Sequence, residues 1–150
     1  MTDRFETFTV LINRISRNVR KIKNLEMADY NLRSPHISCL YYLYISGGLT
    51  ATQLCEKCEE DKATISRSLD YLEENGYIIT QSKNQKKYKN PITLTDKGGD
   101  ISKKIAAKIN NVLDEVSKAL TEEERADFYR SLAIISNSLD DIVKNCEDKE

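Results

Sequence analysis

The densest positive charge in this sequence is a group of four lysines within seven residues, with no acidic residue among them. A second set of side chains, further upstream, combines two cations with two hydroxyls and one small residue. The two sets are Lys83, Lys86, Lys87 and Lys89, and Lys62, Ala63, Thr64, Ser66 and Arg67. Lysine neutralises phosphates and releases condensed counterions. Arginine can bond guanine bidentately, Ser and Thr can bond bases or phosphates, and a small Ala permits close approach or contact with a thymine methyl. Both sets therefore predict contact with double-stranded DNA, and the alternative is a solvated loop beside an exposed helix face.

The net charge of the whole chain gives no support to nonspecific coating of nucleic acid. The 150 residues include 23 basic and 24 acidic side chains, for a formal charge of −1, so bulk basicity is excluded as the source of affinity. The charges are unevenly placed. Residues 62–94 contain six basic and three acidic residues, a net +3, whereas residues 140–150 contain two and five, a net −3. Affinity for a polyanion must come from the first of these segments.

The sequence contains neither a catalytic motif nor a segment that could insert into a membrane. The chain has a single His, no G-x-S-x-G, no phosphate loop and no clustered carboxylates on a β scaffold, so we expect neither an enzyme nor a cofactor. No apolar run approaches the roughly 18 residues of a membrane span, and the N-terminus lacks the layout of a signal peptide. We therefore expect a cytoplasmic protein with no membrane partner, whose cysteines are reduced.

The elements that must position the DNA-contacting residues begin with two helices. Apolar residues recur every three or four positions from Phe8 to Leu25, which predicts an amphipathic helix of about six turns. Ser34 then has the residue type of an N-cap, and Pro35 suits the first position of a second helix. That helix should end at residues 47–48, which are both glycine.

The next two helices form a helix-turn-helix in this interpretation. Thr50 and Gln53 have the spacing of a capping box, and a short third helix should run to about residue 59. Residues 59–61 provide a turn and an N-cap for a fourth helix, which ends at residues 75–76. Its inward face is Ile65, Leu69 and Leu72, so residues 62–67 otherwise point outward near the start of the helix.

A β-hairpin follows the fourth helix. Residues 77–80 and 92–94 are short runs rich in β-branched and aromatic residues, separated by the polar stretch 82–90 that holds the four lysines. A helix-turn-helix followed by such a hairpin is a winged helix, in which the second helix of the motif enters the major groove. The predicted fold class is mainly α with a small β-hairpin wing, flanked by long N- and C-terminal helices.

The C-terminal third returns to the helical period. Residues 121–124 form another capping box. Beyond it, apolar residues alternate spacings of four and three, which is the a/d signature of a helix that packs along a partner helix. This stripe is Phe128, Leu132, Ile135, Leu139, Ile142 and Cys146.

Four stretches of the chain carry a resemblance when they are taken together. They are residues 54–55 (LC), 61–73 (DKATISRSLDYLE), 75–78 (NGYI) and 94–98 (LTDKG). The arrangement resembles the MarR family of bacterial transcriptional regulators over nearly the whole chain, and the distance from Gly76 to Thr95 equals the spacing common in that family. The resemblance implies a homodimer in which residues 1–33 and 96–150 form a helical dimerisation region and residues 34–95 form the winged helix-turn-helix.

The resemblance also implies a function. Members usually repress a nearby operon, so we expect a repressor that binds a palindromic operator and leaves DNA when a small molecule or an oxidant acts on it. The alternative is a winged-helix protein-interaction module without specific DNA binding. The wing departs from the family pattern, because Lys86 and Tyr88 stand where relatives usually carry an Asp and an Arg. Phosphate attraction by the wing should persist, whereas its insertion into the minor groove should be weaker.

The signal that releases the protein from DNA could act on a cysteine thiol or bind in a pocket. Cys55 and Cys58 form a C-x-x-C on a helix, but with one His and no second pair we expect no metal site and interpret both as small core residues. Cys39 is the first thiol to test for oxidation, provided that its thiolate is exposed and stabilised. The candidates to line a pocket for a small aromatic ligand have aromatic rings with polar tips, with Tyr41 and Tyr44 alternatively part of the core. These candidates are Tyr30, His36, Tyr41, Tyr42 and Tyr44.

Overall fold

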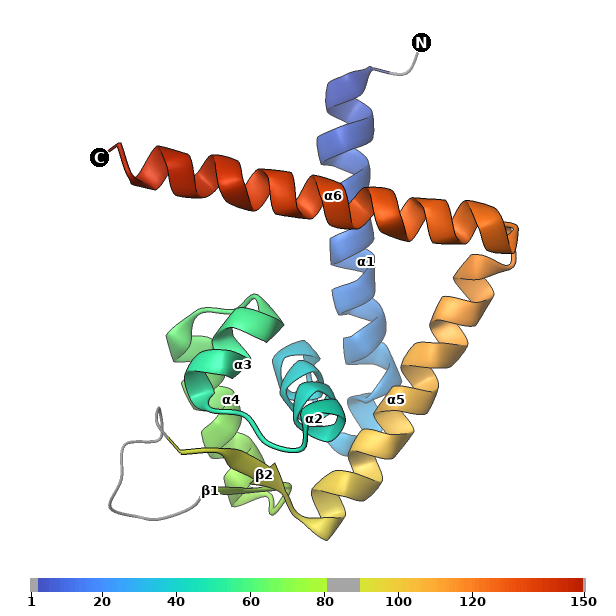
Figure 1. Cartoon of the computed structure of the whole chain (residues 1–150). Coiled ribbons are helices and arrows are strands. Elements are labelled where there is room, and N and C mark those ends of the chain that lie inside the picture. The colour runs from blue at the N-terminus through green and yellow to red at the C-terminus, as the bar shows by residue number, and fades with distance from the viewer. Residues whose placement is uncertain (1–2, 81–89, 150) are drawn as a thin grey trace. The chain divides into compact units, whose positions relative to one another are not determined.

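Helices make up most of the residues that the computed structural model describes, which are residues 3–80 and 90–149 (Figure 1). The chain divides into two compact units, Met1–Lys108 and Ile109–Glu150. The first unit contains a two-stranded antiparallel hairpin and the helices that precede it. The predicted fold class, mainly α with a small β-hairpin wing, is confirmed.

The first long helix carries an apolar stripe that its own unit leaves uncovered. The chain enters α1 (Leu11–Glu26) through a π-helical turn, η1 (Glu6–Val10), so the predicted helix is present. No residue of either segment is buried, and the stripe from Phe8 to Leu25 is 36–68% exposed. A stripe of this kind forms a stable helix only when it packs against apolar surface. Its partner must therefore be sought outside the elements it contacts here.

The second long helix begins one residue differently from the sequence prediction. A short 3₁₀ turn, η2 (Ala28–Tyr30), leads into α2 (Ser34–Ser46), and the N-cap is Arg33 instead of Ser34. The Ser34 amide donates to the Asn24 side-chain oxygen at 2.7 Å. Because a side chain ten residues earlier satisfies this donor, Ser34 already lies inside the helix, and local residue types could not show it.

The helix-turn-helix follows its local signals closely. In α3 (Ala51–Cys58) the Thr50 hydroxyl accepts the Gln53 amide and the Gln53 side chain accepts the Thr50 amide, which confirms the capping box. Glu59 ends this helix in the left-handed region at φ 53°. The next helix, α4 (Lys62–Glu74), begins at the predicted N-cap.

The core lies around α2, which packs against α1, α3, α4 and the second strand (Figure 1). We call the first unit, Met1–Lys108, the winged unit. Apolar side chains from all its parts fill the core, including the three residues of the predicted inward face of α4. Its largest fully buried members are Met27, Leu32, Ile37, Leu40, Leu43, Leu54, Ile65, Leu69, Leu72, Ile92 and Ile105. This core fixes α4 on one side and leaves its other side open.

The hairpin pairs two short strands next to α4. Strands β1 (Ile78–Thr80) and β2 (Ile92–Leu94) run antiparallel, with Ile78 opposite Leu94. Leu49, just before α3, exchanges two backbone hydrogen bonds with Ile92 at 2.8 and 3.2 Å. The base of the wing is thereby attached to the helix-turn-helix.

The last two helices carry apolar side chains that remain exposed. Helix α5 (Asp96–Ser117) buries Ile101 and Ile105 in the first unit. In the second unit, α6 (Glu122–Glu147) begins at the predicted capping box of Thr121 with Glu124. No residue of α6 is buried by the residues that the structure describes, so its predicted stripe is present and largely exposed. Among the described residues, no helix combines the length and the apolar character needed to cross a membrane.

Candidate nucleic-acid interface

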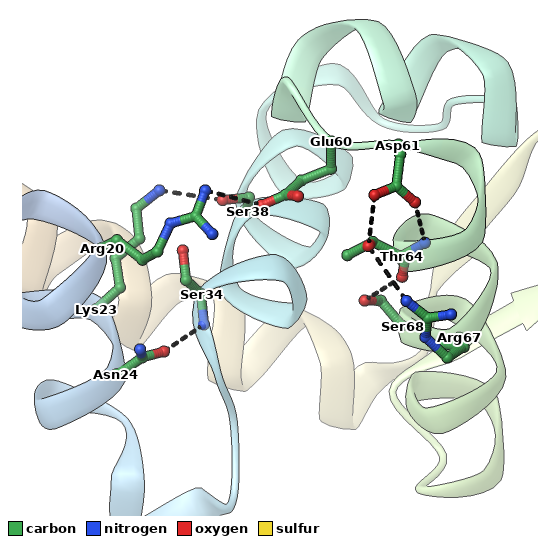
Figure 2. A network of polar contacts seen from close by, with 10 residues as sticks. All are labelled: Arg20, Lys23, Asn24, Ser34, Ser38, Glu60, Asp61, Thr64, Arg67 and Ser68. Atoms are coloured by element: carbon green, nitrogen blue, oxygen red, sulfur yellow. Dashed lines mark hydrogen bonds and ion pairs between the residues drawn. The ribbon is translucent and has the colours of Figure 1, made fainter. Parts of the chain in front are cut away.

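The N-terminus of α4 is fixed by its capping residue. The Asp61 carboxylate accepts the Thr64 amide at 2.7 Å and the Thr64 hydroxyl at 3.1 Å (Figure 2). These hydrogen bonds hold the pKa of Asp61 below its usual range. One turn of α4 is therefore anchored on the face away from the core, where the sequence predicts DNA contacts.

The five predicted helix contacts divide into two groups. Lys62, Ala63 and Arg67 are exposed, whereas Thr64 and Ser66 are half-buried. The exposed three share one end of a helix whose opposite face is buried. Such a helix can present its first two turns to a groove without losing core packing.

Thr64 is engaged on both sides within the helix. Its hydroxyl donates to Asp61, and its oxygen accepts a hydrogen bond from the Arg67 guanidinium at 3.4 Å (Figure 2). Sequence reasoning treated Thr64 as a contact to DNA and missed this role. The signal was available, because Thr64 stands three residues after an Asp N-cap, where a side-chain partner of the cap is expected.

The predicted wing contacts cannot be placed. Lys83, Lys86, Lys87 and Lys89 lie outside the described residues. The strands that precede and follow them are in place, and Thr80 at the end of β1 donates to the Glu73 carboxylate of α4 at 2.5 Å. This bond ties the base of the wing to α4.

Helix α1 is attached by polar contacts to α2 and to the turn between α3 and α4. The Arg20 guanidinium lies 3.4 Å from the Glu60 carboxylate, and the Lys23 ammonium donates to the Ser38 hydroxyl at 3.0 Å (Figure 2). Burial lowers the pKa of Lys23. Glu60 immediately precedes the cap of α4, so α1 contacts the segment that positions the candidate DNA-contacting helix. No spacing of residue types along the chain indicates these long-range pairs.

Comparison with known proteins agrees with this geometry. The family model described as "MarR family" matches residues 30–87, which run from η2 through the helix-turn-helix into the wing. The fold is also that of a MarR family transcriptional regulator from Listeria monocytogenes, solved in complex with a 26mer DNA. The two share 27% sequence identity at a TM-score of 0.79, over 94% of this chain and 91% of that one. The chain therefore contains a segment that matches the MarR family model and has the fold of MarR family regulators.

Two further solved structures share the MarR fold at lower identity. A MarR family regulator from Neisseria meningitidis is 19% identical, with a TM-score of 0.78 over 96% of this chain and 99% of that one. A MarR family protein from Mycobacterium tuberculosis, solved in complex with salicylic acid, is 23% identical, with a TM-score of 0.66 over 85% and 95%. A search of curated protein sequences gives no significant match. These likenesses extend the shared fold across nearly the whole chain.

The first unit of the chain contains a cavity of about 710 Å³ between the end of α1, the start of α2 and α4. His36 stacks on Tyr71 inside it, with ring centroids 4.4 Å apart and planes at 18°. The His36 Nδ1 accepts the Arg33 amide at 3.0 Å, and burial followed by the charge of Arg33 lowers the pKa of His36. The cavity therefore has the stacked rings of His36 and Tyr71 and the charged side chain of Arg33 among its lining residues. Its lining residues are Asn24, Ala28, Asn31, Leu32, Arg33, His36 and Tyr71.

The predicted ligand-binding residues are not brought together in this cavity. Of the five, only His36 lines it. Tyr41 and Tyr42 contact each other edge to face, 5.5 Å apart, Tyr44 is 42% exposed, and Tyr30 lies under the Lys104 ammonium. The alternative that Tyr41 and Tyr44 belong to the core is wrong, since neither is buried. Arg33 and Tyr71 were missed because they line one cavity only through the packing of α4 beside α2.

All four cysteines are free thiols in different surroundings. Cys39, the predicted oxidation candidate, is fully buried, and its hydrogen bond to Cys58 together with burial raises its pKa. Cys55 and Cys58 are half-buried and so do not belong to the core as expected, while Cys146 is exposed. The same hydrogen bond, followed by the charge of Lys23, lowers the pKa of Cys58 against the effect of burial. Within the described residues, no group of three or more Cys, His, Asp and Glu side chains is placed to hold a metal ion.

Proposed function

We propose that this protein is a homodimeric transcriptional repressor of the MarR family that binds a palindromic operator through α4 of each protomer. The observation that carries the proposal is the start of α4. It is capped by Asp61, backed by the buried Ile65 and Leu69, and presents Lys62 and Arg67 to solvent. Cationic side chains on a rigid helix end suit both phosphates and the edges of guanine. No catalytic step is part of this proposal.

The relatives support a DNA-binding role. The Listeria monocytogenes regulator, whose fold this chain shares, was solved with a 26mer DNA. A twofold dimer reads two half-sites whose centres lie one helical turn, about 10 base pairs, apart. The near-neutral charge of −1 makes nonspecific attraction weak, so affinity should depend on both half-sites being engaged.

The exposed stripes support the dimer. Helix α6 presents Phe128, Leu132 and Leu139 at 40–47% exposure, and α1 presents its own stripe. Exposed apolar surface of this extent marks an interaction surface. A second copy of the chain supplies the same apolar faces and is the partner that we propose.

The cavity at Arg33, His36 and Tyr71 supports release by a small ligand. A planar aromatic anion would stack along the rings and place its charge near Arg33. The Mycobacterium tuberculosis protein of the same fold was solved with salicylic acid, which makes salicylate a suitable probe. We expect salicylate to raise the melting temperature of the wild-type chain and not that of an Arg33→Gln variant. Equal shifts for both chains would exclude Arg33 from the site.

The repressor proposal is tested by DNA binding in a salt series. We expect tight binding to a palindrome in the region upstream of its own gene and much weaker binding to a scrambled duplex of equal length. Lys86→Ala or Lys87→Ala should each lower the slope of log affinity against log salt by about one. Arg67→Ala should cost about 1–3 kcal/mol at one base position. Equal affinity for the palindrome and the scrambled duplex would favour the alternative, a module that binds other proteins.

A further inference from the structure

A charged pair joins α1 to the residue before the cap of α4. The Arg20 guanidinium lies 3.4 Å from the Glu60 carboxylate (Figure 2). The Glu60 side chain is only 15% exposed, whereas that of Arg20 is 60% exposed. A largely covered carboxylate needs a partner that compensates for the water it has lost, and Arg20 supplies that compensation from α1. The position of Glu60 therefore depends on α1.

The turn that contains Glu60 adopts a conformation that its own residues do not favour. Glu59 has a φ of 53°, in the left-handed region, where a residue with a Cβ is held by the structure around it. Only residues 59–61 separate α3 from α4, and Asp61 is the N-cap of α4. A contact that holds Glu60 thus also holds the start of α4.

A second contact holds α4 further along its length. The Tyr71 hydroxyl donates to the Asn31 carbonyl oxygen at 2.9 Å. Asn31 ends η2, the short turn between α1 and α2, and is itself left-handed at φ 56°. With one contact alone α4 could pivot, whereas two contacts separated along the helix fix its direction. The start and the later part of α4 are therefore both anchored to α1 or to the segment that directly follows it.

Helix α1 is in turn fixed to the core. The Lys23 ammonium donates to the Ser38 hydroxyl at 3.0 Å, and the Asn24 side-chain oxygen accepts the Ser34 amide at 2.7 Å (Figure 2). Ser34 and Ser38 are both buried on α2, which lies at the centre of the core. Helix α1 is therefore a firm reference for the position of α4.

We propose that Arg20, Glu60 and Tyr71 set the distance between the two α4 helices of the dimer and so select the spacing of the operator half-sites. This inference rests on the proposed function, in which α1 belongs to the dimer interface and α4 contacts DNA. The three are positioning residues, because they act on DNA only through α4. A protomer whose α4 moves freely relative to α1 accepts several spacings, whereas one whose α4 is anchored accepts one.

The contacts are short enough for such selection. One additional base pair separates two half-sites by about 3.4 Å, which two symmetric protomers divide into about 1.7 Å each. Along the line of the charged pair, this displacement would lengthen the contact between Arg20 and Glu60 from 3.4 Å to about 5 Å. The hydrogen bond from Tyr71 would be lost by a similar displacement. With both anchors intact, the chain should therefore reject an operator that differs by one base pair in spacing.

The anchor at Glu60 is tested without DNA. Hydrogen–deuterium exchange is measured by mass spectrometry on the full-length chain, on Arg20→Glu, on Glu60→Arg and on the double variant that exchanges the two charges. We expect the amides of residues 59–64 to exchange about fivefold faster in each single variant and at nearly the wild-type rate in the double variant. Arg17→Glu makes the same charge change at an exposed position of α1 and should leave these rates unchanged. Equal rates in Arg20→Glu and the wild-type chain would overturn this anchor.

The selection of spacing is tested with a series of duplexes. Each contains the same palindromic half-sites at the natural spacing, or with one base pair removed or added. We expect the wild-type chain to prefer the natural spacing about tenfold or more, and Arg20→Glu to reduce this ratio to about threefold or less. The double variant should regain the wild-type ratio, and Arg17→Glu should keep it. Because Glu60→Arg also adds attraction to phosphates, the measurement is the ratio between spacings and not the affinity for one duplex.

The second anchor has its own variant. Tyr71→Phe removes only the hydroxyl that bonds to Asn31, so we expect the ratio between spacings to fall about threefold. Tyr44→Phe removes a hydroxyl from an exposed ring on α2 and should keep the ratio. An unchanged ratio in Tyr71→Phe would show that Tyr71 does not position α4.

The outcomes separate this inference from the proposed function. If exchange accelerates in Arg20→Glu and the ratio between spacings stays at the wild-type value, selection of spacing is overturned. If the wild-type chain binds no palindrome more tightly than a scrambled duplex, the proposed function fails, and the exchange rates still decide whether α1 holds α4. Circular dichroism checks folding. Arg20→Gln and Glu60→Gln remove the charges without creating repulsion and replace any reversal variant that unfolds.

Discussion

Arg67 is held by Thr64, one turn earlier on α4: its guanidinium donates to the Thr64 hydroxyl oxygen at 3.4 Å, while that hydroxyl donates to Asp61 at 3.1 Å. The Thr64 hydroxyl has one proton, which it uses to donate a hydrogen bond to the Asp61 carboxylate. Towards DNA it can act only as an acceptor, and Arg67 already occupies one of its two acceptor positions. Thr64 is therefore better placed to orient Arg67 than to read a base, because a side chain held before binding loses less entropy on binding.

Thr64→Val should consequently weaken operator binding through Arg67. We expect a loss of about 1 kcal/mol, the typical contribution of one hydrogen bond, for the operator and little change for random duplex. Thr64→Ser keeps the hydroxyl and is the control. The measurement is a double-mutant cycle with Arg67→Ala, in which Thr64→Val should add nothing once Arg67 is absent. Fully additive losses would instead make Thr64 a direct contact to DNA.

Two adjacent glycines at the start of α5 should behave in opposite ways. A Cβ on Gly98 would lie 1.9 Å from the Tyr77 carbonyl oxygen, whereas a Cβ on Gly99 would meet nothing within 4 Å. Backbone atoms cannot move aside cheaply, so Gly98→Ala should destabilise the fold by about 3 kcal/mol. Gly99→Ala should instead stabilise α5 by about 0.5 kcal/mol through helix propensity. Urea unfolding of the two variants provides the measurement, and similar free energies for both would refute the close approach.

This close approach explains why residues 94–98 are an informative stretch of sequence. The Thr95 hydroxyl donates to the Gly76 carbonyl oxygen at 2.6 Å and accepts the Gly98 amide at 3.0 Å. The Lys97 ammonium donates to the Asn75 carbonyl oxygen at 2.7 Å and lies over the Tyr77 ring. The segment thus joins the end of α4 to the start of α5, and Thr95, Lys97 and Gly98 each make a specific contact.

Elements determined by short-range signals were predictable from the sequence. The cap of α4 at Asp61, the capping boxes at Thr50 and Thr121, and the left-handed Gly47 and Gly76 all lie where residue type and spacing place them. These features depend on contacts within a few residues, for which local residue preferences are strong.

Features that depend on distant contacts were not predictable. The N-cap of α2 was misplaced because Asn24 reaches Ser34 from another helix. The stacking of His36 on Tyr71 and the pairing of Arg20 with Glu60 follow from how α1, α2 and α4 pack. Periodicity identifies the inward face of a helix but not the residue it meets, so the candidate cavity came from the structure alone.

His36 should make the stability of the fold sensitive to mild acid. Its pKa is lowered by burial and by Arg33, so the folded chain binds a proton less readily than the unfolded chain. The stabilising contribution of the neutral His36 to the free energy of unfolding is complete above the ordinary histidine pKa of about 6.5. This contribution is lost as the pH falls below that value. We expect the free energy of unfolding to decrease between about pH 7.5 and about pH 5.5. In His36→Asn, which keeps an acceptor for the Arg33 amide, the decrease should be smaller.

The comparison between variants isolates this effect. His36 is the only histidine in the sequence, and the carboxylates titrate alike in both chains. Tyr71→Phe retains His36 and the stacked ring, so it should keep the pH dependence of the wild-type chain. A His36→Asn curve parallel to that of the wild-type chain would show that His36 titrates alike in the folded and unfolded states.

The apolar stripe of α6 should hold the dimer together. Leu132 and Leu139 are 40% and 42% exposed in the single chain. In a twofold dimer each leucine would be buried in both protomers, so one substitution removes two buried side chains. Burial of one leucine contributes about 1.5–3 kcal/mol, so Leu132→Glu should weaken dimerisation at least about 100-fold. Asn137→Glu introduces the same charge off the stripe and should leave the dimer intact. Size-exclusion chromatography with light scattering distinguishes the two. A monomeric wild-type chain at micromolar concentration would remove the basis for two α4 helices acting on one palindrome.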